Sequence, residues 1–273
     1  MPQRFVSEQV LSRPAVVMPR PISPRWCALA AGSASIAAFV LLWQLASMRE
    51  ATILFPGPLA TIHAAVVLLR EGVLSQDVLI SLMRIGVGFI AGVAVGVPLG
   101  LAMGAFRPIR IFFEPYIQFF RFVPAIAWLI PAILWFGIGE LSKIFLIFYT
   151  TIFLVLLNTM IGVSSVRRNQ MRAAQCFGAN AWQRYVWVVL PATMPYVLTG
   201  MRLAMGNSFA AVVGAELIAS ERGIGFLIVD SWMWLAADRM FAGMLTLGLL
   251  GVLADYLFQA LSRLCARRYL MRG

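Results

Sequence analysis

Six long apolar stretches run through this chain, and each is about as long as a bilayer core is thick. A membrane-spanning helix needs about 20 mainly apolar residues. The hydrophobic fraction is 61% and the charged fraction 12%, whereas a soluble domain is about half apolar and a quarter charged. We therefore expect an all-α, polytopic membrane protein with about six transmembrane helices. The expected spans are residues 26–48, 78–106, 116–138, 144–166, 192–219 and 240–261.

Positive charge is divided unevenly among the segments that connect these stretches. The net charge is +11, and arginine is concentrated in both termini, in the loop before residue 116 and in residues 167–191. Most acidic residues lie in the other loops. Because cytosolic loops of membrane proteins carry the excess of arginine and lysine, we expect both termini and residues 167–191 to face the cytosol. The expected domains are a flexible cytosolic tail (1–25), a transmembrane domain (26–262) and a basic cytosolic tail (263–273).

The polar interval 167–191 lies between the fourth and fifth stretches and contains no acidic residue. An Ala173-Ala174 pair is followed four residues later by Gly178, and Leu190-Pro191 opens the next apolar stretch. This pattern predicts two short helices outside the membrane, joined by a glycine turn, with Pro191 in the first turn of the next helix. Such an element on an apolar protein favours a docking surface for a soluble partner. Its four arginines are Arg167, Arg168, Arg172 and Arg184.

Glycine recurs at every fourth position of the second stretch, which places five glycines near one helix face. Glycine lets two helix backbones approach closely, and close packing drives association where lipid provides no hydrophobic force. We expect this face to pack against a neighbouring helix rather than to line a pore. Pro98 in this stretch, and Pro124 and Pro131 in the third, predict kinks or breaks. The five glycines are Gly88, Gly92, Gly96, Gly100 and Gly104.

Four charged residues inside the expected spans are candidates for the translocation path, because a charge at the membrane centre costs roughly 3 kcal/mol or more. Structural ion pairs or snorkelling to the surface are favoured over substrate contact for each of them. We expect Asp255 to pair with Arg202, and Arg121 either to reach the surface or to pair with Glu114. The four candidates are Arg121, Arg202, Glu216 and Asp255.

The polar interval resembles the EAA loop of ABC-importer permeases. That pattern is Glu-Ala-Ala, three residues, Gly, nine residues, Ile, one residue and Leu-Pro. Here the spacing is kept throughout, but Arg172 stands where glutamate is usual and Val188 where isoleucine is usual. The residues that match the loop, and to which the resemblance assigns docking on an ATPase, are Arg172, Ala173, Ala174, Gly178, Leu190 and Pro191. Because Arg172 reverses the usual charge, either the ATPase presents an acidic residue to it or its side chain points to water.

Further motifs resemble the nitrate/sulfonate/taurine-type subgroup of these permeases, and the resemblance covers nearly all of the chain from the first span onward. Pro-Gly-Pro at 56–58 follows the first span and precedes an expected short helix that carries the lone histidine, His63. The other motifs are Arg121-Phe122-Val123-Pro124, Leu134-Trp135-Phe136-Gly137-Ile138-Gly139, Ala215-Glu216 and Gly223-Ile224-Gly225-Phe226-Leu227. The subgroup implies a small organic or inorganic anion, such as a sulfonate, taurine or nitrate, as cargo.

The resemblance implies a permease subunit that forms the membrane path of an ABC importer and is not itself an enzyme. The chain contains no GxxxxGK sequence followed by Ser or Thr, so ATP is assigned to a partner subunit and no cofactor to this chain. The expected partners are cytosolic ABC ATPase subunits, a second permease copy in a homodimer, an external substrate-binding protein and membrane lipid, with no nucleic acid. The expected location is the bacterial inner membrane.

Other classes of membrane protein remain alternatives. In an ion- or proton-coupled secondary transporter, the charged residues inside the spans would be coupling sites. A membrane-bound enzyme would normally show clustered His, Cys or acidic residues, whereas this chain has one histidine and three scattered cysteines. A scaffold without transport activity would also explain a docking loop.

Overall fold

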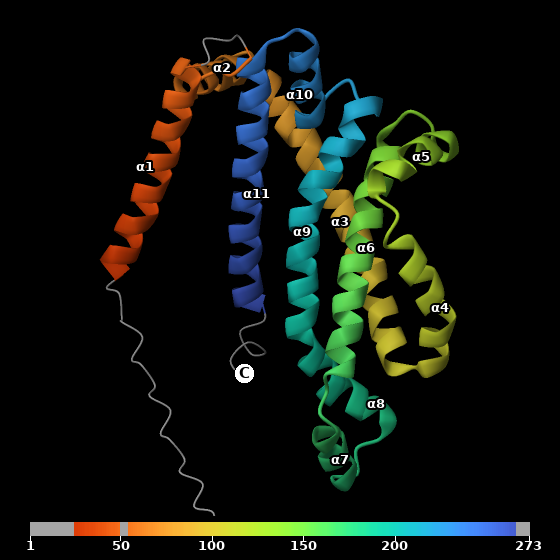
Figure 1. Cartoon of the computed structure of the whole chain (residues 1–273). Helices are drawn as coiled ribbons and strands as arrows, with labels where there is room; N and C mark the ends of the chain where they lie inside the picture. The colour runs from red at the N-terminus through yellow and green to blue at the C-terminus, as the bar shows by residue number, and fades with distance from the viewer. Residues whose placement is uncertain (1–24, 50–53, 266–273) are drawn as a thin grey trace, which may run out of the picture. The chain divides into compact units, whose positions relative to one another are not determined.

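The computed structural model describes residues 25–49 and 54–265, and all regular secondary structure in these ranges is helical (Figure 1). The chain divides into two compact units, residues 1–46 and 47–273. Most of helix α1 (Arg25–Arg49) belongs to the first unit, and the remaining helices belong to the second. Nearly all of the two expected tails, 1–25 and 263–273, lies outside the described residues.

Five helices in the described ranges are long and apolar enough to cross a membrane, or six if one bent pair counts as a single span. These lengths confirm the all-α, multi-span class. The fifth expected span, 192–219, corresponds to α9, and further helical turns that start at Ala181 lead into it. The long helices are α1, α3 (Val73–Ala105), α6 (Glu140–Ser164), α9 (Leu190–Ala219) and α11 (Ala237–Cys265).

The third expected span is broken into two helices, which confirms the break that its prolines predicted. It consists of α4 (Arg107–Phe120), the 3₁₀ turn η1 (Ala125–Trp128) and α5 (Leu129–Phe136), with a bend of 94° between the two halves. Pro124 accounts for the break, because the residue before a proline avoids helical geometry. Pro131 lies in the first turn of α5, where a proline is tolerated.

A side chain from another helix satisfies the backbone at this break. The Tyr149 hydroxyl of α6 lies within hydrogen-bonding range of the carbonyl oxygens of Phe120 and Val123, the latter at 3.3 Å. Carbonyl groups released from helical bonding would otherwise be costly inside a membrane. The bend is therefore supported by α6 rather than by the bent segment alone.

The glycine face of α3 packs directly on α6, as predicted. A Cβ at Gly92 would lie 2.6 Å from Thr151 Cβ, and one at Gly104 would lie 2.5 Å from Val163 Cβ. Both helices advance by four residues from one contact to the next, in the same direction, so they run parallel. The successive pairs are Gly88 with Ile147, Gly92 with Thr151, Gly96 with Val155, Gly100 with Thr159 and Gly104 with Val163.

Helix α6 also packs against α9, and α9 contacts α3 as well, so the three helices pack against one another. Glycine again allows the close approach, since a Cβ at Gly200 of α9 would lie 2.7 Å from Asn158 Cβ. The hydroxyl groups of Thr151 and Ser208 form a buried hydrogen bond of 3.2 Å between the two helices. We refer to α3, α6 and α9 as the scaffold, because the short helices at the two ends of the second unit are attached to them.

Short helices lie at the two ends of this scaffold. The expected helix after Pro-Gly-Pro is α2 (Pro58–Arg70), and His63 is exposed on it as predicted. A further short helix, α10 (Ile224–Met233), connects α9 to α11 at the same end as α2 (Figure 1). The sequence pattern did not predict α10 as a separate helix. The polar interval between α6 and α9 lies at the opposite end.

Candidate functional sites

The polar interval folds into two short helices, α7 (Arg168–Cys176) and α8 (Ala181–Arg184), as the glycine turn predicted (Figure 1). We refer to residues 168–184 as the hairpin. Gly178 has a φ of +76°, a conformation that glycine adopts without steric penalty. Asn180 and Gln183 form a reciprocal capping box that starts α8. The hairpin is therefore held together by local interactions of its own residues.

The hairpin presents two large aromatic side chains that the sequence analysis did not single out. Phe177 is 90% exposed and Trp182 is 72% exposed. Arg172 and Ala173 are also exposed on α7. An exposed aromatic residue on a small projecting element is typical of an interaction site. The signal was available in the sequence, because Phe177 stands directly before the turn glycine.

The hairpin continues into α9 through a turn of π-helix, η2 (Tyr185–Val189). Leu190 begins α9 and Pro191 lies in its first turn, as predicted. A π-turn widens the helix where Pro191 has no N–H group to donate, so the chain stays helical from Ala181 onward. The hairpin is therefore joined to α9 without an intervening loop.

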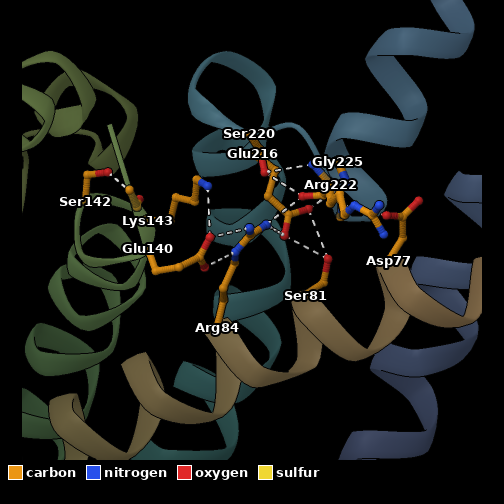
Figure 2. Close-up of polar contacts among 12 residues, drawn as sticks. Asp77, Ser81, Arg84, Glu140, Ser142, Lys143, Glu216, Ser220, Arg222 and Gly225 are labelled. Carbon is orange, nitrogen blue, oxygen red and sulfur yellow. Dashed lines mark hydrogen bonds and ion pairs between the residues drawn. The ribbon is translucent and has the colours of Figure 1, made fainter. Parts of the chain in front are cut away.

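A second candidate site lies at the opposite end of α3. We refer to Asp77, Ser81, Arg84, Glu140, Lys143 and Glu216 as the charge cluster (Figure 2). Arg84 is buried and donates from Nε and Nη2 to the two carboxylate oxygens of Glu140, at 2.6 and 2.7 Å. Its Nη1 donates to Glu216 at 2.7 Å and to the Arg222 carbonyl at 2.8 Å. One guanidinium group thus links α3, α6, α9 and the loop before α10.

Glu216 is fully buried but well supplied with donors. Besides Arg84, its carboxylate accepts hydrogen bonds from Ser81 Oγ at 2.8 Å and from the Gly225 amide at 2.8 Å. The neighbouring amide of Gly223 donates to Asp77. These carboxylates lie at the N-terminus of α10, where the helix dipole favours negative charge. Side chains of α3 and α9 therefore cap α10 and hold it in place.

The Gly-Ile-Gly sequence before α10 follows from this arrangement. Gly223 has a φ of +123°, and a Cβ on it would lie 2.5 Å from the Glu216 carboxylate carbon. A Cβ at Gly225 would lie 2.9 Å from Glu216 Cβ. A side chain at either position would displace the buried Glu216 side chain, so space requires both glycines, and the positive φ is a second requirement at Gly223 alone.

A separate ion pair joins α9 to α11 and confirms the expected pairing of Arg202 with Asp255. Two hydrogen bonds of 2.7 and 2.9 Å connect the guanidinium to the carboxylate. Both side chains are substantially exposed, in contrast to the charge cluster. Arg121 lies 4.6 Å from the centre of the Phe122 ring, whereas Glu114 pairs with Arg110 at 3.2 Å. Of the two alternatives expected for Arg121, the structure agrees with exposure at the surface, and among the described ion pairs Glu114 is paired with Arg110, one helical turn away.

Comparison with known proteins places this geometry in a transport family. Residues 92–268 match the family described as binding-protein-dependent transport system inner membrane component. The chain belongs to this family. It is 38% identical over 221 residues to a probable ABC transporter permease of Brucella melitensis, covering 81% of this chain and 89% of the relative. The permease is thus a multi-span membrane subunit of a binding-protein-dependent transport system.

Other relatives match the permease over similar lengths. The taurine transport system permease protein of Escherichia coli is 35% identical over 227 residues, or 81% of this chain and 82% of the relative. The bicarbonate transport system permease protein of Synechococcus elongatus is 31% identical over 234 residues, or 81% and 84%. The fold is similar to an inward-facing MetNI methionine ABC transporter structure, with a TM-score of 0.61, 17% identity and coverage of 72% and 96%.

The four charged residues expected along the path of the permease do not form one site. Glu216 belongs to the charge cluster, Arg202 and Asp255 form their own pair, and Arg121 lies at the break after α4. The cluster residues Arg84, Glu140 and Lys143 were not among the candidates. Arg84 could have been selected from the sequence, because it is a charged residue inside the second expected span, where an unpaired charge is costly.

Proposed function

We propose that the permease carries a small anion across the bacterial inner membrane as part of an ABC importer. The single observation that supports this cargo is the set of relatives that are named for taurine, aliphatic sulfonates and bicarbonate and are 31–35% identical over 81–83% of this chain. These compounds share a compact sulfonate or carboxylate-like group and differ in the rest of the molecule. We assign the anionic group, rather than one compound, as the common requirement.

We further propose that the hairpin docks on a cytosolic ABC ATPase. The exposed Phe177 and Trp182, the small Ala173 and the turn at Gly178 support this assignment. With the hairpin in the cytosol, the chain termini face the same side and the charge cluster faces the outside, where an external binding protein delivers the cargo. This orientation agrees with the concentration of arginine in residues 167–191 and in both termini.

ATP hydrolysis is assigned to the partner subunit, because the sequence carries no phosphate-binding loop of the GxxxxGK type. We propose that two copies of the permease form a homodimer and that the cargo passes between them. Each copy contributes one hairpin, so two ATPase subunits complete the importer. The chain itself then needs no cofactor.

Uptake of radiolabelled taurine, methanesulfonate and bicarbonate by cells that express the permease with its ATPase and binding protein tests this proposal. We expect uptake of at least one of them to stop when cellular ATP is depleted and to continue when a protonophore collapses the proton gradient. Uptake that survives ATP depletion but stops with the protonophore would instead establish a proton-coupled secondary transporter. Saturable uptake of a cationic or neutral solute alone would contradict the anion class.

A further inference from the structure

One side of the charge cluster opens into a cavity of about 440 Å³, which lies in the size range of small-molecule sites. Arg84, Lys143 and Arg222 line it together with Glu140 and Glu221. The rest of the lining comes from apolar side chains and backbone of α3 and of the loop before α6. Three cations and two carboxylates therefore share one small cavity. Two of the cations, Arg84 and Lys143, are almost completely buried.

Burial is graded across the charged side chains of this cavity. The side chains of Arg84 and Lys143 are only 3% and 6% exposed, whereas that of Glu140 is 45% exposed. The Glu140 carboxylate bridges the two buried cations, with Lys143 Nζ 3.1 Å from Oε1 and the Arg84 guanidinium on both oxygens. Within this group of three, the accessible side chain is thus Glu140, and Arg84 and Lys143 lie behind it, whereas Arg222 is exposed at the cavity.

The two carboxylates bound to Arg84 differ in how firmly they are held. Glu216 is fully buried and also accepts hydrogen bonds from Ser81 and from the backbone amide of Gly225. Glu140 is held by Arg84 and Lys143 alone among the described hydrogen bonds, and its side chain borders the cavity. An incoming anion can therefore replace Glu140 without disturbing Glu216 or the N-terminus of α10.

The donors that Glu140 occupies are those that an oxyanion requires. A guanidinium presents two parallel N–H groups that fit two oxygens of a carboxylate, sulfonate or sulfate, and a lysine adds a point charge to one of them. Without Glu140, Arg84 would keep only Glu216 and Lys143 would lose its described ion pair, which is unfavourable for buried cations, so an anion in this position is favoured. When an external oxyanion replaces the Glu140 carboxylate, Arg84 and Lys143 remain paired with a negative charge.

We propose that this cavity is a binding subsite for a small oxyanion, whose oxygens take the place of the Glu140 carboxylate between Arg84 and Lys143. The inference deepens the proposed function, on which its choice of ligand class rests, because it gives an anionic cargo a site in the permease itself. Glu140 acts as an internal competitor that keeps the two cations paired while the site is empty. When an anion enters, Glu140 turns into the cavity and releases the start of α6 from α3.

Binding of methanesulfonate to the purified full-length permease in nanodiscs tests this subsite, with calorimetry performed at constant ionic strength in sodium chloride. We expect weak binding to the wild type and at least tenfold tighter binding to Glu140→Gln, because the variant lacks the competing carboxylate. The double variant Glu140→Gln/Lys143→Gln has the net charge of the wild type and should lose this gain. Sodium sulfate should behave as methanesulfonate does, since the site recognises the oxygens.

Glu221→Gln is the matched control, because Glu221 lines the same cavity and its replacement changes the net charge equally. Among the described ion pairs, the carboxylates that hold Arg84 and Lys143 are Glu140 and Glu216. Glu221→Gln should therefore bind methanesulfonate as the wild type does. An equal gain in both variants would show a general charge effect, and no gain in Glu140→Gln would show that Glu140 is purely structural. Either result overturns the subsite.

If Glu140→Gln does not fold, as judged by size-exclusion chromatography, Glu140→Asp provides the same test. The shorter side chain keeps the charge but cannot reach both cations, so it should bind methanesulfonate more tightly than the wild type. No gain in that variant also overturns the proposal. The binding assays contain neither ATP nor partner proteins, so a negative binding result does not contradict the assignment as an importer. The uptake experiment tests that assignment separately, and a negative uptake result does not change the measured binding.

Discussion

The two ends of the α3–α6–α9 scaffold use polar residues in opposite ways. At the hairpin end, polar and aromatic groups are exposed, and the elements are held by local turns and a capping box. At the cluster end, charged groups from α3, α6 and α9 are buried against one another and hold α10 through its backbone amides. Exposed groups make the hairpin available to a partner, whereas the buried groups fix the geometry of the chain itself.

Each end has a cavity, and the linings differ in the same sense, because the cavity at the cluster end is lined by five charged residues. The hairpin and the neighbouring ends of α3 and α6 enclose a mainly apolar cavity of about 850 Å³, lined by Pro98, Phe106, Trp182 and Tyr185 among others. At the cluster end, Ser81 and Glu216 are fully buried. Substitutions at the cluster end should therefore reduce stability, whereas those in the hairpin should reduce binding of the ATPase and leave stability nearly unchanged.

The largest effect is expected for Arg84→Met. The substitution leaves Glu216 buried without its cation, and breaking a buried ion pair from one side typically costs about 3–5 kcal/mol. We expect a large drop in the melting temperature of the purified permease, or no folded protein. Arg202→Met removes the cation of an exposed pair and should cost much less. Equal losses in the two variants would contradict the structural role assigned to the charge cluster.

Substitution of a turn glycine by alanine at each end gives a direct comparison. Both Gly178 and Gly223 have positive φ, but nothing lies within 4 Å of a Cβ at Gly178, whereas one at Gly223 meets the Glu216 carboxylate. We expect Gly178→Ala to cost about 1 kcal/mol of stability from backbone strain alone. Gly223→Ala should cost at least about twice as much, because the clash adds to the strain. Thermal unfolding measures both, and a smaller loss at Gly223 would argue against the geometry before α10.

Removal of an exposed aromatic side chain should separate binding from stability. Because Phe177 is largely exposed, Phe177→Ala should leave the melting temperature nearly unchanged. We expect it to weaken ATPase binding about tenfold, which corresponds to about 1.4 kcal/mol. Trp232→Ala is the matched control, since Trp232 is 64% exposed at the end of α10. ATPase co-purification should be lost in the first variant only. Retention in both would exclude Phe177 as a docking residue.

The smallest effect is expected at Arg172. If the ATPase presents an acidic residue at this position, Arg172→Glu should weaken its binding several-fold, because exposed charge pairs contribute up to about 1 kcal/mol. Arg168→Glu, one turn earlier on α7, makes the same charge change and should have less effect. Unchanged binding of Arg172→Glu would show that the side chain points to water.

Features that depend on local pattern could be predicted from the sequence. Glycines at every fourth position of α3 predict a closely packed neighbouring helix, although they do not indicate which one. In the structure this neighbour is α6. Likewise, Gly178 between two short polar segments indicates a turn without any tertiary information. The pair of Arg202 and Asp255 was predictable because both residues lie at similar depth in long apolar stretches, where an unpaired charge is costly.

Features that depend on the meeting of distant segments could not be predicted in this way. Glu216 lies 132 residues from Arg84, and no spacing rule selects Arg84 over other arginines as its partner. The cap of α10 is equally non-local, because its acceptors belong to α3 and α9. Pro124 indicated a break in the third span, but the supporting hydroxyl of Tyr149 comes from the following helix, and only the folded chain brings it there.

Backbone contact along the full glycine face gives α3 and α6 a mechanical property that neither helix has alone. The Ile147 and Val163 side chains lie against Gly88 and Gly104, so each helix prevents the other from sliding along their common axis. A displacement applied where α6 meets the hairpin must therefore tilt the pair as one rigid lever. The charge cluster lies at the far end of that lever, where Arg84 holds Glu216 of α9, so a rotation of the pair acts directly on this ion pair.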